Sequence, residues 1–330
     1  MSISTKRREY LSVLAIGVSS VTAGCNGGGD SSGDTPTSVE TASPTVSPTP
    51  NQEAVTHFEA ATEMLVENKE QLDEWAASSF EPDRVSLLQE RVTIAREELA
   101  AAEENTEQST TLSIRIDQAR LVADFQELSL AYYESVNVFF QVISEAQSFG
   151  DNELHQRAAD SFVEAQAVLE DARTVIEDMG ILLSEIDTGA LDEPELEYTG
   201  DPLDHLDLED RRALDGAESY ALGYENIHLA FVHLEAGQGH YENEEFIEAR
   251  KEWETGQERA TEAKSEFEAA VDNDHLPQNL NEESIRLIGT AETVIEAFDN
   301  FVQGAREAEA GNLEEANTLV TEGFSLLEEL

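Results

Sequence analysis

Residues 311–316 read Gly-Asn-Leu-Glu-Glu-Ala and separate two apolar stripes. In each stripe the apolar residues recur every three or four positions, as on one buried face of an α-helix. The first stripe holds Ile288, Ala291, Ile295, Phe298, Val302 and Ala305, and the second holds Leu313, Ala316, Val320 and Leu327. Glycine followed by asparagine between two such stripes favours a tight turn. The segment therefore predicts an antiparallel pair of helices.

The same plan recurs upstream, and the alternation typical of β-strands is almost absent. Three further hairpins are predicted, with stripes from Val55 to Leu99, from Ile116 to Met179 and from Ala213 to Phe267. Gly180 is expected to end one helix as a C-terminal cap, and a second helix is expected to end near Gly237 and Gly239. The folded part of the chain is thus predicted to be all-α, with four αα-hairpins.

Changes in composition along the chain set the predicted boundaries. Between residues 181 and 208 glycine, proline and acidic residues interrupt the helical period, so we expect a connection whose first part packs on a helix pair. Residues 1–24 are assigned to a signal peptide, 25–52 to a disordered Ser/Thr/Pro/Gly-rich linker, 53–180 to an N-terminal helical module, 181–208 to an acidic connecting loop and 209–330 to a C-terminal helical module.

The C-terminal hairpins resemble tetratricopeptide repeats (TPRs), which place small residues where paired helices approach. The matching residues are Gly304, Gly311, Leu313 and Ala316 in the last hairpin, and Phe246, Ala249 and Trp253 in the one before it. Glu307 replaces an aromatic residue of the family pattern, the turn around Gly239 is long, and the first helices exceed the repeat length. The resemblance implies TPR-like αα-hairpin repeats. Paired four-helix bundles are the alternative architecture.

The chain is strongly acidic, with 71 Asp and Glu against 19 Lys and Arg, a formal net charge of -52 and a pI near 4.1. Such self-repulsion loosens a compact state in dilute buffer, whereas at molar salt the Debye length falls to about 3 Å. We therefore expect the fold to depend on salt. Scarce lysine beside abundant acid resembles the proteins of haloarchaea. No basic patch is available for nucleic acid, so none is expected as a partner.

The N-terminus has the features of an export and lipidation signal. Lys6, Arg7 and Arg8 precede an apolar run shorter than the roughly 20 residues that span a bilayer, and small residues lead to Cys25. Arg7 and Arg8 resemble the twin-arginine (Tat) export signal, and the ending at Cys25 resembles a lipobox. Cys25 is the only cysteine and has no internal disulfide partner. The resemblance to haloarchaeal Tat-exported lipoproteins implies a membrane anchor at Cys25, on the outer face of the cytoplasmic membrane.

No pattern in the chain predicts catalysis. The motifs of zinc peptidases, α/β-hydrolases and phosphate-binding loops are absent, and no cofactor is expected. The densest group of candidate ligands is His228, His233 and His240 with Glu244 and Glu245. The step of five residues from His228 to His233 turns the two side chains about 140° apart on a helix. We therefore predict a non-enzymatic protein without a metal site in this group.

Two functions fit these features. The first is a non-catalytic interaction scaffold, whose stacked hairpins engage an envelope protein or peptide. The alternative is a lipoprotein that binds a small solute or a metal and is associated with a transporter. Its candidate ligand-binding residues are Tyr220, Tyr224 and His228, which would line a cavity with convergent polar groups. Aromatic residues at helical spacing are more often part of a core.

Overall fold

The computed structural model describes residues 52–77, 81–106, 110–196, 210–328 and 330. The structural statements below concern these residues. Arg7, Arg8, Cys25 and nearly all of the predicted linker lie outside them. Within the described ranges the regular structure is helical throughout, which confirms the all-α prediction. None of these helices combines the length and the apolar character needed to cross a bilayer.

The long helices form four hairpins, as predicted: α2 with α3, α4 with α5, α8 with α9, and α10 with α11. The elements in chain order are α2 (Gln52–Ala77), the 3-10 turn η1 (Pro82–Arg84), α3 (Val85–Glu104), α4 (Thr110–Asp151), α5 (His155–Glu185), the short α6 (Thr188–Leu191), η2 (Pro194–Leu196), α8 (Arg211–Glu242), α9 (Phe246–Val271), α10 (Gln278–Glu309) and α11 (Leu313–Leu327).

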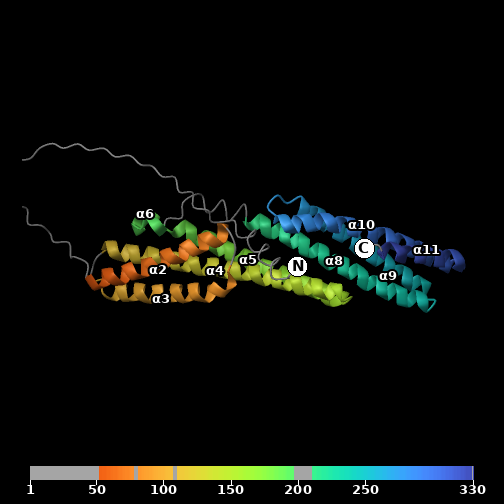
Figure 1. The fold of residues 1–330 in the computed structure, drawn as a ribbon, viewed down its shortest axis with the longest axis horizontal. Helices are drawn as coiled ribbons and strands as arrows, with labels where there is room; N and C mark the ends of the chain where they lie inside the picture. The colour runs from red at the N-terminus through yellow and green to blue at the C-terminus, as the bar shows by residue number, and fades with distance from the viewer. Residues whose placement is uncertain (1–51, 78–80, 107–109, 197–209, 329) are drawn as a thin grey trace, which may run out of the picture.

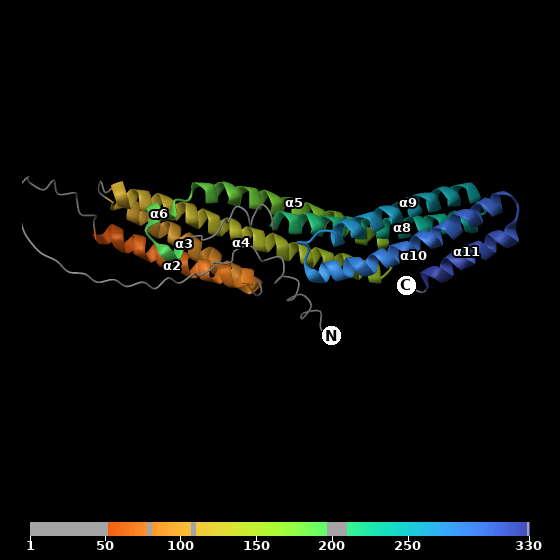
Figure 2. The same ribbon diagram turned by 90° about the horizontal axis from the view of Figure 1, so that it is seen from above.

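The helices pack in sequence order along an elongated molecule (Figures 1 and 2). Each long helix contacts the next one, and this includes α5 against α8 across the connection between the two modules. A closed four-helix bundle would also pair its first helix with its fourth. Neither α2 with α5 nor α8 with α11 forms a comparable interface. The architecture in the described residues is therefore a stack of hairpins.

One continuous apolar core runs through this stack. It contains the stripes that the helical period predicts, and its largest members are fully buried, among them Trp75, Phe139, Trp253 and Phe298. Burying a large apolar side chain of this kind contributes about 1.5–3 kcal/mol relative to leaving it exposed. Packing along the stripes, rather than local helix propensity, therefore holds the array together.

Three of the four hairpins turn in the same way. In each turn one residue adopts the left-handed conformation, and the amide of the next residue donates a hydrogen bond of 2.8–2.9 Å to the carbonyl five residues earlier. This is the Schellman arrangement that satisfies the last carbonyls of a helix. The left-handed residues are Glu153 in the α4–α5 turn, Glu244 in the α8–α9 turn and Gly311 in the α10–α11 turn. The second helix begins two residues after each of them.

The three hairpins also have the same types of residue at equivalent packing positions, when positions are counted from the left-handed residue. Small residues stand seven positions before it and five after it, and an apolar residue stands nine after it. The sets are Ala146, Ala158 and Phe162, then Gly237, Ala249 and Trp253, then Gly304, Ala316 and Val320. A Cβ atom added at Gly237 would collide with the indole ring of Trp253, and one at Gly304 would lie 2.8 Å from Val320. The hairpins are therefore three versions of one packing unit.

Two helix ends differ from the prediction. Helix α5 continues past Gly180 to Glu185, because Leu182, Leu183 and Ile186 extend its apolar stripe against the core. Helix α8 continues past Gly237 and Gly239 to Glu242. The turn around Gly239 is therefore no longer than the others.

The first part of the connection after α5 packs on the N-terminal helices, as expected. Short helix α6 contacts α4, and η2 contacts α2. Leu191 and Leu196 are fully buried there. Arg115 of α4 donates a 2.8 Å hydrogen bond to the carbonyl of Leu191 and forms a 2.7 Å ion pair with Glu193. This segment thus belongs to the N-terminal module.

Candidate functional site

Tyr220, Tyr224 and His228 lie at successive turns of α8 and are nearly inaccessible, with exposed fractions of 0%, 8% and 8%. The structure brings them together, as the ligand-site hypothesis requires. Their polar neighbours come from two other parts of the chain, the turn end of the α4–α5 hairpin and the first turns of α10. The site is therefore the junction between the N-terminal and C-terminal modules.

Glu283 of α10 is the centre of the polar contacts at this junction. Its two carboxylate oxygens accept hydrogen bonds from the hydroxyls of Tyr220 at 2.9 Å and of Tyr224 at 2.6 Å. The amide nitrogen of Gln147, on α4, lies 3.2 Å from the Tyr220 hydroxyl oxygen and 3.4 Å from Glu283. The Glu283 side chain is only 17% exposed. These contacts tie α4, α8 and α10 together.

Burial raises the pKa of both tyrosine hydroxyls, and the neighbouring carboxylate of Glu283 raises each pKa further. Both hydroxyls therefore remain protonated donors at any physiological pH. Donors and acceptors at the junction are matched, because the carboxylate of Glu283 only accepts and the phenols donate to it. The hydroxyls that the ligand-site hypothesis assigned to a ligand are thus engaged by the protein itself.

A row of rings continues from Tyr224 to the turn of the α4–α5 hairpin. Phe162 stacks on Tyr224 with ring centroids 4.8 Å apart, and His155 stacks on Phe231 at the same separation. Between them the Nδ1 atoms of His155 and His228 lie 3.2 Å apart, within hydrogen-bond distance. Burial, and to a smaller extent the neighbouring His155, lower the pKa of His228 to about 4. This row joins α5 to α8.

The remaining histidines of the predicted group have separate partners. His233 lies 2.8 Å from Glu252, and His240 lies 2.6 Å from Glu245. His228 faces His155 instead. Among the described residues no three histidine, cysteine or acidic side chains are grouped as a metal site would require.

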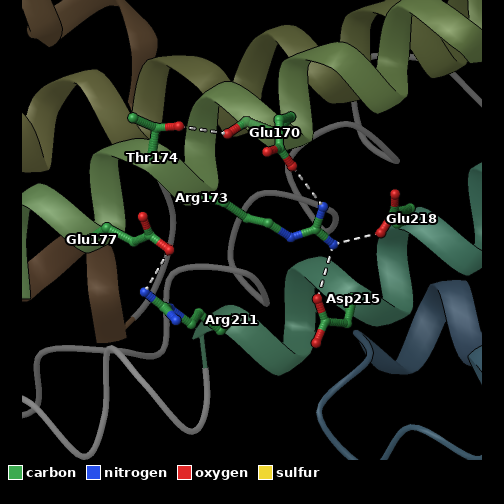
Figure 3. A network of polar contacts seen from close by, with 7 residues as sticks. All are labelled: Glu170, Arg173, Thr174, Glu177, Arg211, Asp215 and Glu218. Carbon is green, nitrogen blue, oxygen red and sulfur yellow. Dashed lines mark hydrogen bonds and ion pairs between the residues drawn. The ribbon is translucent and has the colours of Figure 1, made fainter.

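Ion pairs extend the same α5–α8 seam (Figure 3). Arg173 of α5 contacts Asp215 at 2.9 Å and Glu218 at 2.6 Å on α8, and Glu170 at 3.3 Å on its own helix. Arg211 of α8 contacts Glu177 at 3.0 Å. Partial burial alone would lower the pKa of Arg173, but Glu218 and Asp215 raise it above its ordinary value. The guanidinium therefore stays charged.

Other cations of this acidic chain also bridge neighbouring helices. The pairs are Arg91 with Glu67, Arg96 with Asp124, Arg120 with Glu103, Arg250 with Glu309, and Lys264 with Glu292. Each joins two helices that are adjacent in the stack, where carboxylates from both sides would otherwise repel. The scarce basic residues are thus used at helix seams.

Sequence analysis did not identify Gln147, His155 and Glu283 as site residues. They are between 59 and 136 residues away from the side chains that they contact, so no local pattern connects them. Aligning the hairpins by their equivalent turns shows which positions of α8 differ from those of α10. At the positions of Tyr220, Tyr224 and His228, helix α10 carries apolar Leu287, Ala291 and Ile295. On α4 the same positions hold Ser129, Tyr133 and Asn137. Polar residues at these positions are therefore not required by every hairpin.

Comparison with protein-family models, with curated proteins and with solved structures finds no match to the chain.

Proposed function

We propose that the chain is an extracytoplasmic lipoprotein, exported through the Tat signal at Arg7 and Arg8 and anchored by Cys25 to the outer face of the cytoplasmic membrane. Its helical stack serves as a non-catalytic scaffold for an envelope protein or peptide. The observation that carries the proposal is that the hydroxyls of Tyr220 and Tyr224 bind Glu283. Polar groups with partners inside the fold hold helices together and have little capacity left for a ligand.

The three equivalent turns support a TPR-like interpretation of the hairpins. Their small residues have the spacing that the TPR pattern uses at helix crossings. The helices are longer than in a repeat of about 34 residues, since α4 alone has 42. Repeats of this kind stack into extended surfaces that bind partners. The outward face of α11 carries Glu314, Glu315 and Glu322, all exposed, as expected for the terminal unit of a stack.

The test is proximity labelling of the anchored protein at molar salt, analysed by mass spectrometry. We expect one envelope protein to be enriched, and its enrichment to be lost with Cys25→Ser. A matched control carries residues 1–51 on an unrelated acidic domain, which separates binding by the helices from simple closeness to the membrane. Enrichment that is equal for the control, or absent for the native protein, would contradict the scaffold function.

A lipoprotein that binds a small solute or a metal for a transporter is the second candidate. The convergence of Gln147, Tyr220, Tyr224 and Glu283 at one buried point favours it. Native mass spectrometry of the protein purified from its membrane distinguishes the two functions. A retained mass that disappears in Glu283→Gln and persists in Glu282→Gln would support the solute-binding function.

A further inference from the structure

The turn of the α4–α5 hairpin lies directly against the ring of His228. A Cβ atom added at Gly150 would be 2.5 Å from Cε1 of His228 and 2.9 Å from its Nε2, so a side chain there would displace the ring. His155, the first residue of α5, approaches the same ring from the other side of the turn. The two histidines therefore mark the place where the tip of one hairpin meets the side of the next.

This meeting point is displaced relative to the next hairpin junction. Where α9 packs on α10, Arg250 near the start of α9 contacts Glu309 at the end of α10. The N-terminal end of α9 therefore lies beside the C-terminal end of α10. Where α5 packs on α8, the start of α5 lies beside His228 and Phe231. Helix α8 continues from there to Glu242, about three further turns. The α4–α5 tip is thus docked partway along α8.

Neither histidine is needed to build the hairpin. In the other two hairpins the position of His155 holds Phe246 and Leu313. On α10 the position of His228 holds Ile295. On α4 the position of His228 holds Asn137. Neither position therefore requires a histidine, and two facing imidazoles require an explanation beyond packing.

The chemistry of the pair depends on its protons. With Nδ1 atoms 3.2 Å apart, one ring donates an N–H and the other accepts it, so the neutral pair needs opposite tautomers. One added proton leaves this hydrogen bond intact. A second proton places two N–H groups against each other and puts two positive charges beside the rings of Phe162, Tyr224 and Phe231.

The charges around the pair act mainly on His155. The carboxylates that favour its charged form are Glu235 on α8 and Glu153 in the turn. Glu283 of α10 reaches this row only through the hydroxyl of Tyr224, and α9 contributes the uncharged ring of Phe267 against Tyr224. Among the described residues, none with a negative charge stabilises a proton on His228, and the charged group that acts on it is His155, which repels the proton.

We propose that His155 and His228 form a proton-sensitive latch, which holds the α4–α5 turn on the side of α8 and releases it in acid. Release would free the tip from α8 and expose the rings of Phe162, Tyr224 and Phe231. The latch is a property of the free protein and is independent of any partner.

The direction of the effect follows from linkage. His228 has a pKa near 4 when docked, against an ordinary value of 6.5. The released state therefore binds more protons between these values, so docking is complete above about pH 6.5 and weakens as the pH falls toward 4. Burial also lowers the pKa of His155, and its protonation acts in the same direction.

Hydrogen exchange of the full chain in molar KCl, followed by mass spectrometry at pH 7 and pH 5, tests the latch. The reporter is the peptide that covers residues 147–158, with rates corrected for the intrinsic effect of pH. For a pKa change from 6.5 to about 4, exchange through the released state should become roughly 20-fold faster at pH 5. A carboxyl group with the ordinary pKa of about 3.9 for aspartate or about 4.3 for glutamate is mostly ionised at pH 5.

The decisive variant is His155→Phe combined with His228→Ile, which places at both positions the residues of the equivalent hairpins. The double variant should keep its protection at pH 5, whereas His240→Gln, which removes an unrelated histidine of α8, should behave like the wild type. Should the double variant not fold, His228→Gln replaces it and should remove most of the rise. Equal wild-type protection at both pH values, or the same acid response without the histidines, would overturn the latch.

Discussion

At the scale of single residues, two glycines of α8 differ in whether the packing of the helices leaves room for a side chain. Gly237 is covered by the indole of Trp253, while nothing lies within 4 Å of the position that a Cβ would take at Gly239. Gly237→Ala should destabilise the protein by about 1–3 kcal/mol, because the ring must move within a close-packed core. Gly239→Ala should stabilise it by up to about 1 kcal/mol through helix propensity.

Urea unfolding of both variants at one fixed molar concentration of KCl measures these changes. The two sites are on the same helix and receive the same methyl group, so each variant controls for the other. If both substitutions changed the free energy of unfolding in the same direction, close approach of α8 and α9 at Gly237 would not be the cause.

The residues of the junction show what sequence alone could locate. Tyr220, Tyr224 and His228 recur along one helix, so the sequence could place them together, and all three are buried in the structure. Glu283 was not predicted, since its role arises only when α10 is laid beside α8. Tertiary contacts between side chains distant in sequence leave no periodic trace, and a glutamate among 71 acidic residues is not conspicuous.

At the scale of helices, the α5–α8 seam depends on few cations. The Arg173 side chain is only 19% exposed and faces Asp215, Glu218 and Glu170 (Figure 3). Arg173→Ala leaves these carboxylates without their shared partner, so we expect a loss of about 1 kcal/mol at low salt. The loss should shrink at molar salt, because screening weakens the repulsion between the carboxylates as well.

Arg306→Ala is the matched control for this prediction. Arg306 is 60% exposed and pairs with Glu254 across the α9–α10 seam. An exposed single pair contributes about 0–1 kcal/mol, so this variant should be nearly neutral in thermal unfolding. A loss as large as that of Arg173→Ala would show that burial and the number of carboxylates do not set the effect.

The sequence predicted which segments form helices, but it was less successful in predicting where those helices end. The 3.6-residue period identified all four hairpins, since each buries one apolar face. Ends predicted at Gly180 and Gly239 were wrong because apolar residues beyond them continue to pack, among them Leu182 and Tyr241. Two of the left-handed turn positions carry Glu153 and Glu244, where glycine would be the conventional signal. Packing of the following helix therefore overrides local preference.

At the scale of the whole molecule, stacking in sequence order gives an elongated body with a large surface for its charge (Figure 2). Each added hairpin contacts mainly its predecessor, so stability is expected to be shared along the stack rather than concentrated in one closed core. The chain carries a net charge of -52. At the α5–α8 seam carboxylates stand on both helices, so repulsion between hairpins opposes the contacts that hold the stack together.

Salt should accordingly stabilise this protein. Raising KCl from about 0.1 M to above 1 M shortens the Debye length from about 10 Å to about 3 Å. We expect the midpoint of thermal unfolding to rise by roughly 10 °C, which corresponds to a few kcal/mol in a protein of this size. Sucrose at matched osmolality separates screening from the general strengthening of apolar burial by excluded solutes.

A variant with fewer negative charges tests whether repulsion between carboxylates causes the salt dependence. Glu314, Glu315 and Glu322 are exposed on α11, and Glu328 is exposed directly after its last residue. Changing all four to Gln removes four negative charges, so the unfolding midpoint should depend less on KCl than in the native chain, with the difference largest below about 0.1 M, where the Debye length exceeds 10 Å. If sucrose reproduced the effect of KCl, or the variant kept the full salt dependence, charge repulsion would not be what limits the fold at low salt.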